Sequence, residues 1–165
     1  MLGLEAPRMD TLRPRSTSRH STIQLETRHP TQFIDLTDEV EALVNKAGIM
    51  TGLVNIQSLH TTTAIVVNEH EPLLLADVTA MLERLSPQGI VYRHDSVSLR
   101  GANCVLGERP NGHSHCRALL LAPAACLNIV AGRLQLGRWQ RVFFVELDGP
   151  RLRDVSVLFI GESEL

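Results

Sequence analysis

A histidine and three hydroxyl side chains follow an apolar stretch in the tract Ser58-Leu-His-Thr-Thr-Thr-Ala64. Imidazole can bind a metal, hold a phosphate as a cation or transfer protons near neutral pH, and threonine hydroxyls can hydrogen-bond to anionic oxygens. We therefore take His60 as a candidate catalytic and metal-binding residue, and Thr61 and Thr62 as candidate anion-binding residues. A histidine at the end of a strand can equally be structural, with its ring hydrogen-bonded to neighbouring groups.

A second pair of histidines occurs in the tract Asn111-Gly-His113-Ser-His115. In an extended chain, His113 and His115 project to the same side and can bind one ion together. In a helix that begins at His113, the two rings diverge by roughly 200° around the axis and cannot bind one ion together. The sequence leaves both conformations open, and Asn111 is a candidate anion-binding residue beside them.

Carboxylates and amides near the histidines are candidates for proton transfer. Asn68 and Glu69 come just before Pro72, where a strand is expected to end and a helix to begin. They either act with His60 in catalysis or are ordinary residues of a helix start. His94 precedes Asp95, but adjacent side chains in an extended segment point to opposite faces, so this pair is either part of the site or solvated loop.

Two further segments combine polar and aromatic residues. Glu146, Asp148 and Arg151 surround a turn, where a carboxylate and an arginine can form an ion pair or face an anionic ligand. The segment that ends in Trp139 and Gln140 precedes an apolar strand. Its tryptophan is therefore expected first to pack in the core or at an interface, and second to line a pocket. We include Gln140 and Arg151 among the candidate anion-binding residues.

Length and composition restrict the class of protein. The 165 residues fit about one domain, and a formal charge of −2 gives no electrostatic reason to expect nucleic acid as a partner. Three cysteines without paired spacing suggest neither a disulfide framework nor a zinc knuckle, which fits a reducing cytoplasm. No signal peptide or membrane-spanning run is apparent. Residues 1–20 show no periodicity and are expected to be a disordered extension.

Hydrophobic periodicity predicts an α+β domain over residues 21–163. Apolar stripes, caps and breakers predict two helices at 37–47 and 72–85, and a short third helix at 114–121. Alternating or β-branched segments predict strands at 21–27, two strands within 51–67, and strands at 127–130, 140–147 and 153–160. Most connections are too short for parallel crossovers, so the sheet should be mixed or largely antiparallel. The glycine-punctuated stretch 91–112 is expected to be a long functional loop.

Taken together, these motifs resemble one family, the YjbQ-like proteins, also called secondary thiamine-phosphate synthases. The resemblance spans about residues 21–163 and depends on seven ordered segments: Phe33–Glu39, Ser58–Thr62, Asn68–Glu69, Tyr92–Asp95, Asn111–His115, Gly137–Gln140 and Glu146–Arg151. It implies a compact α+β subunit, a homotrimer, and a metal or anion site on His60, His113 and His115. It also implies that Asn68, Glu69 and His94 accompany these histidines.

The expected function is that of a small-molecule enzyme acting on a phosphorylated metabolite, with a weak thiamine-phosphate synthase activity as the reaction that the resemblance implies. The expected cofactor is a divalent ion, zinc, magnesium or manganese. Two alternatives remain open: a metal-dependent hydrolase of phosphorylated metabolites with Glu69 as base, and a non-catalytic trimer that binds a small anion.

Overall fold

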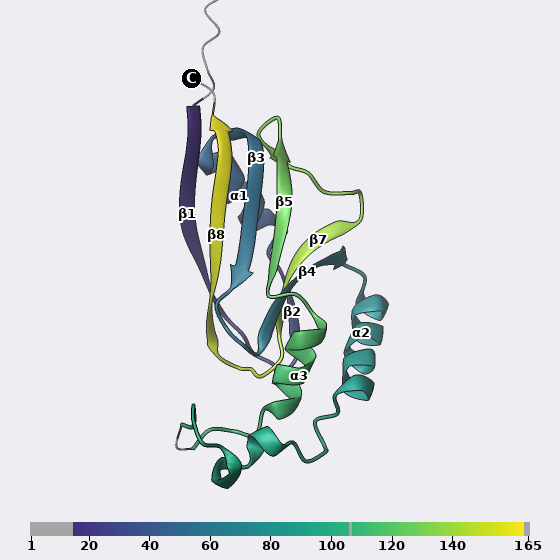
Figure 1. Cartoon of the computed structure of the whole chain (residues 1–165). Coiled ribbons are helices and arrows are strands. Elements are labelled where there is room, and N and C mark those ends of the chain that lie inside the picture. Colours follow the sequence, from purple (N-terminus) through teal and green to yellow (C-terminus); the bar gives the residue numbers. More distant parts are fainter. Residues whose placement is uncertain (1–14, 106, 164–165) are drawn as a thin grey trace, which may run out of the picture.

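Two antiparallel sheets and three α-helices make up the part of the chain that the structure, a computed structural model, describes: residues 15–105 and 107–163 (Figure 1). The first sheet has the order β1-β8-β3-β5-β6 and the second β2-β7-β4. The strands are β1 (Arg15–Glu26), β2 (Gln32–Asp35), β3 (Ile49–Ser58), β4 (Thr63–Glu69), β5 (Ala124–Val130), β6 (Arg133–Leu134), β7 (Gln140–Glu146) and β8 (Leu152–Ser163). The α-helices are α1 (Thr37–Ala47), α2 (Pro72–Leu85) and α3 (Gly112–Leu120).

Local sequence explains where α1 ends and where α2 begins. Helix α1 ends at Gly48, whose φ of 65° is the left-handed conformation that favours glycine after a helix. Helix α2 begins at Pro72, and the carboxylate of Glu71 accepts hydrogen bonds from the next two free backbone N–H groups of the helix. The end of α1 and the start of α2 are therefore specified by residues beside them in the sequence.

The main hydrophobic core lies between α1 and the two sheets. Val40 and Val44 of α1 pack against alternate side chains of β8, including Val157 and Phe159, and all four are essentially inaccessible to water. A second, smaller apolar cluster lies around Leu82 of α2 and joins the second sheet to α2 and α3. Helices α2 and α3 and the segment between them extend from one end of the sheets, where Figure 1 shows the chain from α2 looping back to α3.

Two glycines allow β3 and β8 to pair closely. A Cβ on Gly52 would lie 2.2 Å from the carbonyl oxygen of Ile160, and a Cβ on Gly161 would lie 2.3 Å from the carbonyl oxygen of Thr51. Any larger side chain at either position would push the two strands apart. Strand β8 can therefore lie between β1 and β3 along its whole length.

The predicted α+β class is confirmed, as are the three helices and the two strands that meet near His60. Strand β1 begins at Arg15, within the region expected to be disordered, and the rest of that expected extension lies outside the described residues. The sequence did not reveal the short strands β2 and β6. The long loop contains two single 3-10 turns, Arg93–Asp95 and Val97–Leu99.

Within the described residues, no helix combines the length and the apolar character needed to cross a membrane.

Candidate active site

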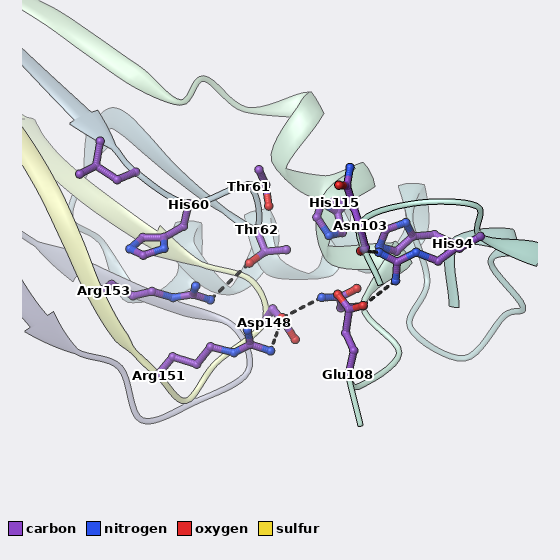
Figure 2. Close-up of a pocket in the computed structure, with 13 residues that line it drawn as sticks. His60, Thr61, Thr62, His94, Asn103, Glu108, His115, Asp148, Arg151 and Arg153 are labelled. Atoms are coloured by element: carbon purple, nitrogen blue, oxygen red, sulfur yellow. Dashed lines mark hydrogen bonds and ion pairs between the residues drawn. The ribbon is translucent and has the colours of Figure 1, made fainter. Parts of the chain in front are cut away.

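A polar cavity of about 480 Å³ lies at the end of the sheets that carries α3. Its walls come from four segments distant in sequence: the β3–β4 connection, the loop between α2 and α3, the start of α3, and the β7–β8 turn with the first residues of β8. The lining residues are Leu59, His60, Thr61, Thr62, His94, Arg100, Asn103, Glu108, Asn111, His115, Asp148, Arg151 and Arg153. Figure 2 shows His60, Arg151 and Arg153 on one side of this cavity and His94, His115 and Glu108 on the other.

His60 is held against the start of β8. Its Nε2 accepts a hydrogen bond of 2.9 Å from the backbone N–H of Asp154, so the ring is neutral and carries its proton on Nδ1. Burial, followed by the positive charge of Arg153, lowers the pKa of His60 below its ordinary value of 6.5. The neutral ring can therefore offer one N–H donor to a bound group.

A buried ion pair supports the wall beside His60. Glu146, fully inaccessible to water, receives two hydrogen bonds of 2.7 Å from Arg153, and Arg153 also reaches the hydroxyl of Thr62 at 3.3 Å. The same carboxylate accepts the backbone N–H groups of Leu147 and Asp148. Burial alone would raise the pKa of Glu146, but the bond from Arg153 and the backbone bonds outweigh it, so the pKa is lowered. Glu146 is therefore ionised and fixes the β7–β8 turn.

Asp148 is the carboxylate that the turn presents to the cavity. One of its oxygens accepts a hydrogen bond from the Asn111 side chain at 3.1 Å and forms an ion pair with Arg151 at 2.8 Å. Arg109 donates to the backbone carbonyl of Asp148 at 3.0 Å. The interpretation of this turn as an ion pair is thus confirmed, and the pair lines the cavity together with Asn111.

The opposite wall carries two imidazoles in edge-to-face contact. The ring centroids of His94 and His115 are 4.6 Å apart, and the buried Nε2 of His94 is without a hydrogen-bond partner in the described part of the chain. Burial, followed by the charge of His94, lowers the pKa of His115. Arg100 pairs with Glu108 at 2.5 Å behind them. A buried ring nitrogen without a partner is costly unless a ligand satisfies it.

Asp95 joins the long loop to the start of α3. Its Oδ1 accepts the backbone N–H groups of Asn111 at 2.9 Å and of Gly112 at 2.8 Å, which caps the helix with a side chain from a distant segment. Gly112 is packed against Tyr92, where a Cβ would lie only 2.5 Å from the tyrosine side chain. This contact fixes the position of His94 relative to His115.

The structure corrects the expected three-histidine metal site. His113 and His115 lie in a helix, so their rings diverge, and His113 is buried with its Nε2 3.1 Å from the Ser114 hydroxyl and outside the cavity. His60 already uses its Nε2 on the backbone of Asp154. Among residues 15–105 and 107–163, no three His, Cys, Asp or Glu side chains are grouped so that they could hold a metal ion. The residues present do not fit a divalent ion on His60, His113 and His115.

Three other predicted residues lie outside the cavity. Asn68 and Glu69 are at the far end of β4, roughly 20 Å from its start beside His60, at about 3.3 Å per residue. Gln140 pairs with Glu69 across the strands, and its side chain accepts the N–H of Gly137 at 2.7 Å. The strand that carries Asn68 and Glu69 continues away from the site, which the sequence alone did not show.

The cavity also contains residues that the sequence analysis missed, among them Arg100, Asn103, Glu108 and Arg153. For Arg153 a signal existed, because it occupies the same alternating face of β8 as the buried Val155, Val157 and Phe159. A charged residue in register with core positions indicates a buried ion pair or a site. No comparable signal marks the loop residues.

The fold and the cavity define a small α+β protein with a polar cavity at one end of its sheets. Comparison with known families identifies the family: the model of the UPF0047 protein YjbQ-like family matches residues 21–162. The chain belongs to this family, as the motifs suggested.

Relatives and solved structures agree with this assignment. The chain is 36% identical to a UPF0047 protein of Methanothermobacter thermautotrophicus over 85% of this chain and 90% of the relative, and 38% identical to one of Archaeoglobus fulgidus over 82% and 96%. The crystal structure of a YbjQ-like protein of unknown function from Sulfolobus solfataricus P2 superposes with a TM-score of 0.80 at 32% identity, covering 90% of this chain and all of that one. A hypothetical protein from Aeropyrum pernix K1 gives 0.77 at 33% identity, with 87% and 99% covered.

Proposed function

We propose that this chain is a cytoplasmic small-molecule enzyme that binds a phosphorylated metabolite in the polar cavity. The observation that carries the proposal is the convergence of three arginines and three histidines from four distant segments on one cavity. Arginine is the side chain best suited to binding phosphate oxygens through paired N–H groups. The imidazoles of His60 and His115 and the threonine hydroxyls supply further donors.

The cavity keeps donors available although its arginines are paired. Arg151 contacts Asp148 through one terminal nitrogen, and a guanidinium has five N–H groups. Arg153 is held rigidly by Glu146, so a ligand does not have to order it on binding. Such preorganised donors stabilise a negative charge that develops during a reaction.

The imidazoles supply the proton chemistry. The pKa of His60 and of His115 is lowered by burial, so both rings are neutral near pH 7, and a bound anion would favour their protonation. Asp148, oriented by Asn111 and Arg151, is the carboxylate best placed to accept a proton from a ligand. In this proposal it replaces Glu69.

The finer activity we propose is that of a weak transferase, which joins a pyrimidine diphosphate to a thiazole phosphate to give thiamine phosphate. In that reaction the carbon–oxygen bond to the diphosphate breaks, the ring nitrogen of the thiazole forms a bond to the same carbon, and the diphosphate leaves as an anion. Arg151, Arg153 and His60 lie together on one wall and would neutralise the departing charge. No step of this proposal passes through a metal ion.

Titration of the purified protein with inorganic diphosphate by calorimetry tests the anion site. We expect Arg151→Gln to weaken binding about tenfold, because a charge-assisted hydrogen bond contributes roughly 1.5 kcal/mol. Arg28→Gln, at an exposed position outside the cavity, serves as the matched control. Equal affinities for wild type and Arg151→Gln would overturn the proposal.

Product analysis separates the transferase from the alternatives. Mass spectrometry after incubation with the two phosphorylated substrates should detect thiamine phosphate. Release of inorganic phosphate from simple phosphate esters, without thiamine phosphate, would instead favour a hydrolase. Binding of diphosphate without any turnover would favour a non-catalytic metabolite-binding protein.

We also propose that the chain forms a homotrimer. Several large apolar side chains are exposed on the loop between α2 and α3, including Val97, Leu99 and Val105. Contiguous exposed apolar surface is typical of protein interfaces. Analytical ultracentrifugation should give three times the mass of the 18.3 kDa chain, and a monomer at micromolar concentration would contradict this proposal.

A further inference from the structure

A second cavity of about 460 Å³ adjoins the polar one and differs from it in chemistry. The two cavities share His60, Thr61 and His115. Beyond these shared residues, the second cavity is lined chiefly by apolar side chains, with Leu119 and Leu121 the largest of them. The wall of His60 and His115 therefore has an anion-binding side and an apolar side.

Helix geometry places the two chemistries on one face of α3. His115 and Leu119 are four residues apart, so their side chains lie one turn from each other on the same side of the helix. The side chain of Leu119 therefore lies one helical turn away from any group bound near His115 in the polar cavity.

The apolar wall is open to water in the isolated chain. Leu119 is 86% exposed, and leaving such an apolar residue in water has a free-energy cost that an apolar partner removes. The apolar cavity shares three lining residues with the polar one, so the two cavities adjoin at His60, Thr61 and His115. This adjacency favours a small ligand as the occupant.

We infer that the molecule bound by this protein is amphiphilic, with its phosphate in the polar cavity and an apolar or aromatic body against Leu119 and Leu121. This inference depends on the proposed anion site and adds the residues that select the body of the ligand. Leu119 is then a specificity-determining residue that has no part in holding the phosphate.

Two probe molecules separate the contributions of the cavities: methyl phosphate, which has almost no apolar body, and benzyl phosphate. Burial of roughly 60 Å² of a benzyl ring at about 25 cal/mol per Å² predicts binding of benzyl phosphate about tenfold tighter than that of methyl phosphate. Calorimetric titration of the full chain measures both affinities.

Leu119→Asn should reduce this preference to about twofold or less and leave the affinity for methyl phosphate unchanged. Leu120→Asn is the matched control, because Leu120 is the next residue, is 55% exposed and does not line the cavity. It should keep the tenfold preference.

The outcomes distinguish the inference from the proposed function. Equal binding of the two phosphates would overturn the inference and leave the anion site standing. Binding of neither phosphate would overturn the anion site and the inference with it. If Leu119→Asn changes the oligomeric state but not the preference for benzyl phosphate, a second copy of the chain occupies the apolar cavity and the inference is wrong.

Discussion

Replacing Glu146 by glutamine should lower the free energy of unfolding by about 3 kcal/mol. Glu146 is fully buried, and both of its oxygens accept hydrogen bonds from Arg153, whose side chain is only 5% exposed. Glutamine keeps the shape but leaves the arginine charge without a counter-ion, a change that typically costs 3 to 5 kcal/mol. The lower end applies here because Arg153 also borders the polar cavity, where water can reach part of its guanidinium.

Urea denaturation followed by circular dichroism measures this loss. A domain of this size has a total stability of roughly 5 to 15 kcal/mol, so the midpoint should move far outside experimental error. Asp38→Asn is the control, because Asp38 also pairs with an arginine, Arg141, but its side chain is 80% exposed, and its midpoint should barely change. If the two variants were equally stable, the buried pair would not stabilise the turn as we describe.

Three further changes follow from the structure. Asp95→Ala removes the acceptor for two N–H groups at the start of α3 and should lower the free energy of unfolding by about 1 to 2 kcal/mol. The melting temperature should fall accordingly, and an unchanged melting temperature would argue against the cap. Gly52→Ala would place a Cβ 2.2 Å from a carbonyl oxygen of β8 and should cost about 3 kcal/mol or more, so a soluble protein of wild-type stability would contradict the close strand contact. The pKa values of His60, His113 and His115 are lowered in the folded protein, so in acid the unfolded chain binds more protons than the folded one. The urea midpoint should therefore be constant above about pH 6.5. It should decrease as the pH falls from about 6.5 through the lowered pKa values. A midpoint that is the same at pH 7.5 and 5.5 would contradict this last prediction.

Helices α1 and α2 could be predicted from the sequence because the end of α1 and the start of α2 are specified locally. Gly48 stops α1, and Pro72 with Glu71 starts α2, so both helices follow from a few neighbouring residues. Strands β2 and β6 have only four and two residues and are defined by their partners β7 and β5, which a local pattern cannot reveal. Strand β1 begins in a polar segment that was expected to be disordered, because pairing with β8 stabilises the extended chain there.

The candidate site was predicted in part for the same reason. His60, Thr61 and Thr62 lie at the end of a recognisable strand, and the structure places all three in the cavity. The conformation around His113 depends on a helix start that Asp95 caps from a different segment, so the sequence left it open. Residues of the long loop are brought to the cavity only by tertiary contacts, which a local sequence pattern does not reveal.

The position of β8 also bears on how the chain folds as it is made. Glu26 pairs with Leu152 and Arg15 with Ser163, so the strand that separates β1 from β3 is the last of the described chain to be synthesised. Until it leaves the ribosome, the edges of β1 and β3 that it will pair with lack their partner, and exposed strand edges promote aggregation. These two edges are therefore covered only once β8 has been synthesised and has paired with both strands.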